Sequence, residues 1–181
     1  LITLQQATEE LENALKLAGF ELHRVSLVPQ DLGGLVKLEI VKFALGKIIV
    51  EGNSRYSEAN VRASLPELQE GRAPNFRTLA VQTAIANENP GKQVQVSLKE
   101  SDEADRIDVK LLLKESDLTS LSFSLSNTGS ESTGNNRVSV VAAHANVLGM
   151  DHQASLAYTT APERIKDVTQ LGLNYRIPLY A

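Results

Sequence analysis

Apolar residues near the start of the chain recur at intervals of three and four: Leu4, Ala7, Leu11, Leu15 and Ala18. This spacing places them on one face of a helix that we expect over residues 4–18. Thr3 stands where an N-cap would accept a backbone hydrogen bond. Gly19 suits the end of the helix because glycine readily adopts a positive φ.

Two runs with strand character follow this helix, at residues 20–28 and 35–43. The stretch between them, 29–34, contains a proline and two glycines and predicts a turn. The pattern therefore predicts an α-β-β unit over residues 1–43 whose beginning is not included.

The next stretch repeats this order in full. Residues 46–50 form a short apolar run, and Ser57 is placed to cap a brief helix over 58–64. Apolar residues at helical spacing then mark a second helix: Phe76, Leu79, Ala80, Thr83 and Ala86. Alternating apolar residues mark two further strands on either side of the polar turn 101–105: Val94, Val96, Leu98, Ile107, Val109, Leu111 and Leu113. Residues 44–115 are thus predicted to form one β-α-α-β-β module.

Polar residues alternate with the valines of the first of these strands: Gln93, Gln95, Ser97 and Lys99. We therefore expect a sheet with helices on one face and water on the other. Such a sheet has open edges, and an edge strand can bind an extended peptide through its main chain. The alternative, an edge that merely faces water, remains open at this point.

From residue 116 onward only the strand period is present. Four alternating segments of about 9 to 12 residues can be distinguished: 118–126, 137–147, 152–160 and 168–179. In the last of them Leu171, Leu173 and Tyr175 share one face, while Asn174 and Arg176 share the other. This length and alternation are typical of a transmembrane β-barrel wall, although a half-buried soluble sheet would alternate in the same way.

The links between these segments favour the barrel. They are long at 127–136, short at 148–151 and longer again at 161–167. Outer-membrane barrels alternate short periplasmic turns with longer outer loops. Because four strands cannot close a barrel, we expect the wall to continue beyond Ala181.

Composition narrows the function further. The chain has no Cys and no Trp, a net charge of -4 and three His. Zinc ribbons, iron–sulfur clusters and thiol nucleophiles are excluded, and nothing suggests binding to nucleic acid. No spacing typical of a metal or catalytic site occurs, so we expect no enzyme and no cofactor. No run of about 18 apolar residues is present, so no membrane-spanning helix is expected. The start at Leu1, without a signal segment, indicates an excerpt of a longer protein.

Several short motifs occur in a familiar order: Phe20 with Pro29-Gln30-Asp31-Leu32, then Gly46-Lys47-Ile48-Ile49-Val50-Glu51-Gly52-Asn53, Asn127-Thr128-Gly129 with Thr133-Gly134, Asn146-Val147-Leu148-Gly149, and Tyr175-Arg176-Ile177-Pro178-Leu179. In these motifs the chain resembles the haemolysin secretion and activation proteins. These are the outer-membrane transporters of two-partner secretion, of the FhaC and ShlB type. The resemblance covers almost the whole chain.

The resemblance implies an α+β chain of POTRA modules followed by antiparallel strands from the start of an outer-membrane β-barrel. Residues 1–43 would be the C-terminal part of a first POTRA domain, 44–115 a complete second one, and 116–181 the first four strands of the barrel. The protein would lie in the outer membrane of a Gram-negative cell, with its POTRA domains in the periplasm. Those domains would bind an unfolded secreted partner and deliver it to the pore.

In the POTRA arrangement, the strand that begins at Lys92 is the expected edge for strand addition. The expected partner-binding residues are Lys92, Gln93, Val94, Gln95, Val96, Ser97, Leu98 and Lys99. The expected partners are the secreted polypeptide and, for the full-length protein, outer-membrane lipid. The excerpt would bind without transporting, and its open strand edges could pair with a second copy. The alternative function is a soluble structural or adhesive domain with a β-sandwich in its second half.

Overall fold

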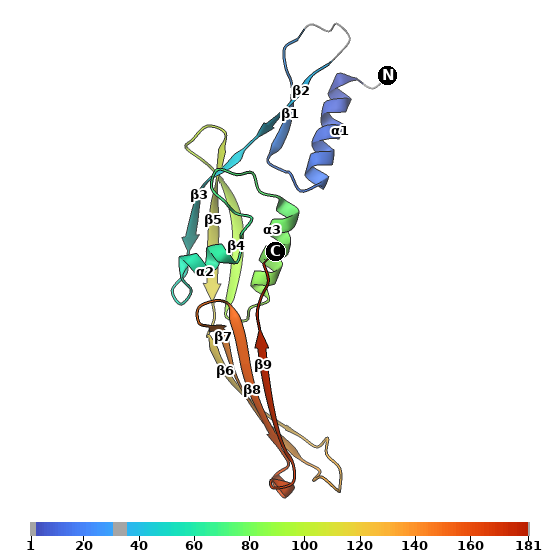
Figure 1. The fold of residues 1–181 in the computed structure, drawn as a ribbon, viewed down its shortest axis with the longest axis vertical. Coiled ribbons are helices and arrows are strands. Elements are labelled where there is room, and N and C mark those ends of the chain that lie inside the picture. Colours follow the sequence, from blue (N-terminus) through green and yellow to red (C-terminus); the bar gives the residue numbers. More distant parts are fainter. Residues whose placement is uncertain (1–2, 31–35, 181) are drawn as a thin grey trace.

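The computed structural model describes residues 3–30 and 36–180. It contains helices and strands in a mixed α and β arrangement, and the strands of the described residues form three separate sheets. Figure 1 shows the sheets following one another along the long axis of the molecule, in the order of the sequence. Within the described residues, no helix combines the length and the hydrophobicity that crossing a membrane requires.

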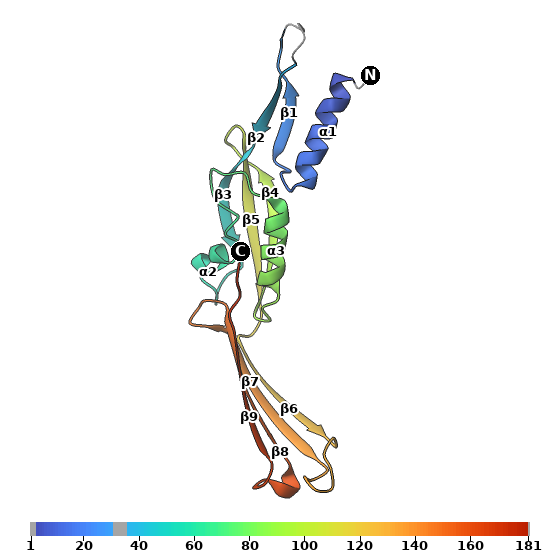
Figure 2. The same ribbon diagram turned by 45° about the vertical axis from the view of Figure 1, so that its right-hand side comes forward.

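The first unit confirms the predicted helix and strands. Helix α1 (Leu4–Leu17) begins with a capping box, in which the Thr3 side chain accepts a bond from the backbone of Gln6 and the Gln6 side chain accepts one from Thr3. Strands β1 (His23–Leu27) and β2 (Leu38–Lys42) pair antiparallel, and α1 lies alongside them (Figure 2). Most of the predicted turn, residues 31–34, and Leu35 lie outside the described residues.

The second unit has the predicted β-α-α-β-β order. Its elements are β3 (Ala44–Glu51), α2 (Glu58–Ala63), α3 (Phe76–Asn87), β4 (Lys92–Glu100) and β5 (Arg106–Glu115). The strand order is β3-β5-β4, with β5 parallel to β3 and antiparallel to β4. Strand β4 therefore lies at one edge of the sheet. Phe43 alone separates β2 of the first unit from β3.

The main hydrophobic core lies in this second unit. The helices cover one face of the sheet, and fully buried residues come from strands and helices alike: Leu45, Tyr56, Val61, Leu65, Val109 and Leu111. Phe43, which precedes the unit, and Tyr180, which follows β9, pack against the same core. The core thus joins segments that lie on either side of the module.

The first two units meet where α1 ends and α3 begins. The Asn75 side chain caps α3 by accepting bonds from the backbone of Arg77 and Thr78, and its amide nitrogen donates to the carbonyl of Ala18. The backbone N–H of Phe76 donates to the carbonyl of Gly19. Gly19 has a φ of +93°, and a Cβ added there would collide with the Asn75 side chain. Glycine is therefore required at this contact for two separate reasons.

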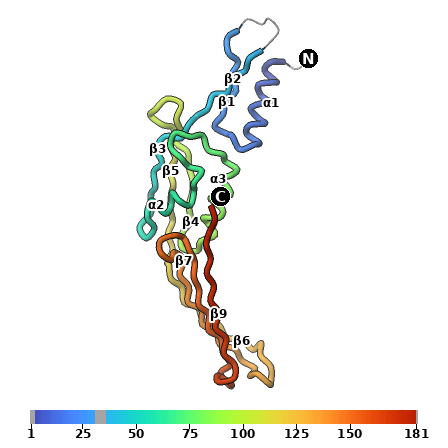
Figure 3. The backbone as a smooth tube through the Cα atoms, viewed as in Figure 1, coloured from blue at the N-terminus to red at the C-terminus, as the bar shows by residue number. Residues whose placement is uncertain are grey.

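The third sheet contains β6 (Thr119–Ser126), β7 (Arg137–Val147), β8 (His152–Thr160) and β9 (Thr169–Arg176) in sequence order, all antiparallel. These strands match the four predicted segments, except that the last ends at Arg176 instead of 179. A short 3-10 helix, Pro162–Arg164, lies in the last long link. Figure 3 shows the chain after β9 returning toward α2 and α3.

The register of the third sheet collects its apolar residues on one face. Opposite one another on that face lie Leu121, Phe123, Leu125, Val138, Val140, Ala142, Leu156, Tyr158, Leu171, Leu173 and Tyr175. The other face carries mostly serine, threonine and other polar or small residues. Leu125 is 81% exposed and Leu173 is 79% exposed. No second sheet packs on either face within residues 3–30 and 36–180.

Replacing Gly19 with alanine should lower the free energy of unfolding by about 2–4 kcal/mol, because a left-handed φ and a steric collision add together. Gly71→Ala is the matched control, since Gly71 has a φ of +80° but open space around its Cβ position. We expect the control to lose only about 1 kcal/mol. Urea unfolding of the chain in mild detergent, followed by circular dichroism, measures both. Equal losses would contradict the role assigned to the Asn75 contact.

Candidate functional site

Strand β4 offers the open edge of the β3-β5-β4 sheet. It pairs with β5 along its whole length and has no strand on its other side among the described residues. The opposite edge, β3, is largely occupied by the chain between α2 and α3. Leu45 exchanges backbone bonds with Arg72 and Gly71, and the Arg62 guanidinium donates to the carbonyl of Ile48. The edge that the sequence analysis predicted is therefore the accessible one.

The main-chain groups along β4 alternate between β5 and the open side, as in any antiparallel pair. The Val94 N–H and C=O are both bonded to the side chain of Asn87, so they point away from β5. The same groups of Val96 and Leu98 must point to the same side. In the part of the chain that the structure describes, neither Val96 nor Leu98 forms another backbone hydrogen bond there. Val96 and Leu98 thus each present a free donor and a free acceptor beside α3.

The side chains of β4 also alternate as predicted. Gln93, Gln95, Ser97 and Lys99 are exposed on the uncovered face of the sheet. Val94 is buried and Val96 half-buried, since their side chains lie toward α3. The expectation of a sheet with one wet face is confirmed for this strand.

An apolar groove runs between α3 and the edge of β4. Its volume is about 670 Å³, and residues of both elements line it: Phe76, Leu79, Ala80, Thr83, Val94, Val96 and Leu98. A second hollow of about 520 Å³ lies at the β4–β5 turn and shares Leu98 with the groove. Its lining includes Lys99, Glu100 and Glu103. The edge of β4 therefore combines free main-chain groups, an apolar groove and, at the β4–β5 turn, charged residues.

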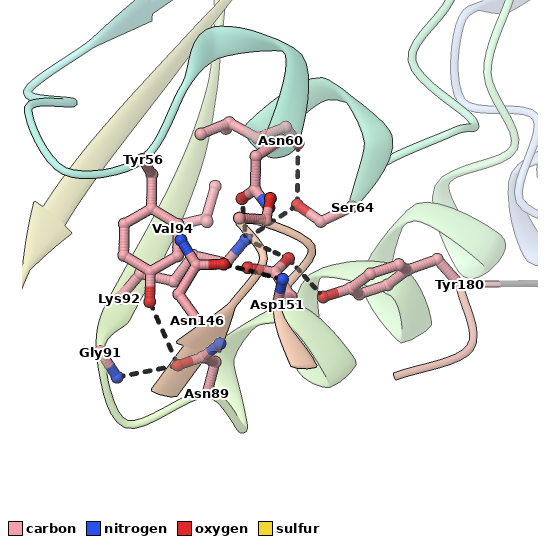
Figure 4. A network of polar contacts seen from close by, with 12 residues as sticks. Tyr56, Asn60, Ser64, Asn89, Gly91, Lys92, Val94, Asn146, Asp151 and Tyr180 are labelled. Carbon is pink, nitrogen blue, oxygen red and sulfur yellow. Dashed lines mark hydrogen bonds and ion pairs between the residues drawn. The ribbon is translucent and has the colours of Figure 1, made fainter. Parts of the chain in front are cut away.

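Lys92, the first of the predicted binding residues, has a different position. Its side chain is fully buried, and its Nζ lies 2.6 Å from Oδ2 of Asp151, which is 2% exposed (Figure 4). The same Nζ donates to Asn60 and Ser64 of α2 and its C-terminal end. Lys92 thus joins the module to the β7–β8 turn through its side chain, and the open part of the edge begins further along β4. Partner contact at the remaining residues stays a prediction.

Several more hydrogen bonds surround this ion pair and fix the β7–β8 turn. Asn60 donates to the carbonyl of Gly149, and Asn89 donates to the carbonyl of Ala145. Within the turn, Asn146 accepts a bond from the backbone N–H of Asp151, which has a φ of +62°. We refer to this set of contacts, centred on Lys92 and Asp151, as the junction. It connects α2, the start of β4 and the turn of the third sheet.

The chain after β9 completes the junction. The Tyr180 hydroxyl donates to Oδ2 of Asp151 at 2.8 Å, and Arg176 forms an ion pair with Glu88 at the end of α3. Burial lowers the pKa of Lys92, and the hydrogen bond and charge of Asp151 oppose this shift. Burial and the charge of Asp151 raise the pKa of the Tyr180 hydroxyl, so this group remains a neutral donor.

Glu115, the last residue of β5, fixes the loop that follows β3. Its carboxylate accepts backbone bonds from Ser54, Arg55 and Tyr56, which lie in the loop after β3. Burial acts to raise the pKa of Glu115, but these three bonds together bring it below its ordinary value. The carboxylate therefore stays ionised and keeps the loop attached to the end of β5.

The sequence analysis did not identify the junction. Asp151 and Lys92 are 59 positions apart, and no spacing rule connects them. The histidines lie on different strands, His23 on β1, His144 on β7 and His152 on β8. Within the described ranges, no three His, Asp or Glu side chains gather as a metal ion would require.

The carboxy-terminal part of the chain, residues 105–181, matches the family model of the haemolysin secretion/activation protein ShlB/FhaC/HecB. This match covers less than half of the chain, and the family is the one that the sequence motifs resemble. The match agrees with the location expected from the motifs, an outer membrane with POTRA-like units on its periplasmic side. No curated protein sequence matches the chain.

Solved structures of similar fold match nearly the whole chain. CdiB from Escherichia coli superposes with a TM-score of 0.81 and 20% identity, over 97% of this chain and 33% of that one. CdiB from Acinetobacter baumannii gives 0.71 and 18%, over the same shares. POTRA domains 1–3 of Omp85 from Anabaena give 0.53 and 22%, over 64% of this chain and 51% of that one. The chain thus has a mixed α+β fold with POTRA-like modules, and it spans about a third of the length of the CdiB proteins.

Replacing Lys92 with methionine should lower the free energy of unfolding by about 3–5 kcal/mol, because Asp151 would remain buried without its counter-charge. The double variant Lys92→Met, Asp151→Leu should recover much of this loss, since neither buried charge of the pair is then left. Lys99→Met, on the exposed part of the same strand, should change stability by less than about 0.5 kcal/mol. Denaturant unfolding of the three variants measures the differences. A Lys92 variant as stable as the Lys99 variant would refute the importance of the pair.

Proposed function

We propose that this chain receives an unfolded secreted protein in the periplasm and leads it to the pore of an outer-membrane transporter of two-partner secretion. The observation that carries the proposal is the free edge of β4 beside an apolar groove. A polypeptide in extended form meets both requirements at once, because its main chain can pair with Val96 and Leu98 while alternate side chains enter the groove.

The chemistry of the edge favours a polypeptide that is not yet folded. Folded proteins have already paired most of their main-chain groups, whereas an unfolded segment still has unpaired ones to offer. A free edge of this length gives few hydrogen bonds, each of which contributes about 0.5–1.5 kcal/mol net. Binding at this edge is therefore weak and reversible, as is required of a site that must pass its ligand onward.

The arrangement of the units supports the assignment of the domains. In this proposal residues 1–43 are the C-terminal part of one POTRA domain, 44–115 are a complete second one, and 116–181 are the first four strands of a barrel wall. The apolar face of β6–β9 would contact lipid, and the serine-rich face would line the aqueous lumen. The junction then holds the binding edge in a constant position relative to the wall.

The alternative function, a soluble structural or adhesive domain, requires the second half to be a β-sandwich. A sandwich buries one face of each sheet against the other. Among the described residues no second sheet covers the apolar face, and its leucines on β6 and β9 are exposed. The two functions differ in a simple property, since a full-length transporter needs detergent for extraction whereas a soluble domain does not.

Val96→Pro should weaken the binding of an extended peptide about three- to tenfold. Proline removes the outward N–H of Val96 but no hydrogen bond between β4 and β5. The probe is a fluorescent peptide of alternating valine and threonine with a lysine at each end, which complements Glu100 and Glu103. Fluorescence anisotropy with the whole chain measures its affinity.

Val96→Thr is the control for this experiment, because threonine has almost the same shape and keeps the N–H. It should bind the peptide more tightly than the proline variant does. Equal affinities of the wild-type and proline chains would show that capture uses other residues, and strand addition at β4 would have to be abandoned.

Leu173→Arg should reduce the amount of full-length protein in the outer membrane, while Asn174→Arg should leave it nearly unchanged. The two residues are neighbours on β9, but they lie on opposite faces of the sheet. An arginine facing the middle of the lipid layer costs about 2–4 kcal/mol, whereas one facing the lumen is hydrated. Immunoblots of isolated outer membranes compare the two. Equal losses, or a loss with Asn174→Arg alone, would contradict the assignment of the faces.

A further inference from the structure

The side chain of Asn87 occupies a place on β4 that a neighbouring strand would otherwise fill. Asn87 is the last residue of α3. Its Oδ1 accepts a bond from the Val94 N–H at 2.6 Å, and its Nδ2 donates to the Val94 C=O at 3.1 Å. One side-chain amide therefore satisfies both main-chain groups of a single edge residue.

This pairing reproduces what an added strand would do. In a hydrogen-bonded pair of antiparallel strands, two opposite residues exchange both of their N–H to O=C bonds. The amide of Asn87 offers the same acceptor and donor to Val94. A peptide cannot pair with Val94 while Asn87 is in place, but Val96 and Leu98 are not affected.

We propose that Asn87 is a stop that sets the end and the register of a strand added to β4. This inference rests on the proposed function and specifies its binding mode. The added segment pairs with Val96 and Leu98, and its end nearest the membrane lies at Asn87. Its alternate apolar side chains enter the groove between Leu79, Thr83 and Val96.

The position of the stop protects the junction. Only Gln93 lies between Val94 and Lys92, whose side chain is buried with Asp151. The backbone N–H of Lys92 is itself bonded to the carbonyl of Asn89. A strand that extended past Val94 would reach the segment that holds the module to the third sheet. With Asn87 in place, the edge binds only a short segment, and the contacts of the junction stay intact.

Hydrogen exchange of the whole chain in detergent, read at single amides by NMR, tests the stop. Without peptide, the amide of Val94 should exchange slowly and those of Val96 and Leu98 quickly. The Val-Thr peptide described above should slow exchange at Val96 and Leu98 only. In Asn87→Ala, Val94 should exchange quickly without peptide and slowly with a peptide extended by further Val-Thr repeats.

The affinities of the short and the extended peptide test the stop independently of hydrogen exchange. In the wild-type chain the short and the extended peptide should bind equally well, because the added repeats find no free edge. In Asn87→Ala the extended peptide should bind about three- to tenfold more tightly than the short one. Val81→Ala, an exposed position on α3 away from the groove, is the control and should behave like the wild type.

The outcomes separate this inference from the proposed function. If the peptide protects Val96 and Leu98 but Asn87→Ala gains nothing from the longer peptide, the stop is refuted and strand addition stands. If neither peptide protects β4 in any variant, the proposed function fails as well. Should Asn87→Ala not fold, Asn87→Ser replaces it, because its single short hydroxyl cannot bond both main-chain groups of Val94. The longer peptide should again bind more tightly than the short one, and equal binding overturns the stop.

Discussion

The buried ion pair between Lys92 and Asp151 determines how the third sheet is held against the β3-β5-β4 unit. Two charges without water are costly unless further hydrogen bonds surround them, and here Asn60, Ser64 and Tyr180 supply those bonds. All of the partners must be in place together, so the contact has one satisfactory geometry. A purely apolar contact of the same size would tolerate sliding, because dispersion and hydrophobic burial have little directional preference.

Local patterns were sufficient to predict the elements. The spacing of Leu4, Leu11 and Leu15 predicted α1, and the alternation along β4 to β9 predicted strands whose faces the structure reproduces. Such patterns are visible because helix and strand repeat their side-chain direction every few residues. The ends were predicted less well, since β9 stops at Arg176, where the chain leaves the sheet and passes toward the junction.

The contacts between elements could not be predicted in this way. Sequence reasoning predicted Lys92 as an exposed edge residue, because it begins a strand in which polar and apolar residues alternate. Only the folded chain brings Asp151 next to it. The pairing of Asn87 with Val94 is of the same kind, since seven positions separate a helix end from a strand across a turn. Tertiary contacts of single polar side chains leave no periodic trace in a sequence.

The single residue between β2 and β3 has a mechanical consequence. Because Phe43 is the only residue between the two strands, and its backbone is bonded to Leu22 while its ring packs on the main core, the first two units are joined without slack. A force applied to the first unit therefore passes along the covalent backbone into β3, and from there into β5, with which β3 is paired. A change in the orientation of the first unit must therefore be absorbed within one residue or passed on to the strand that follows.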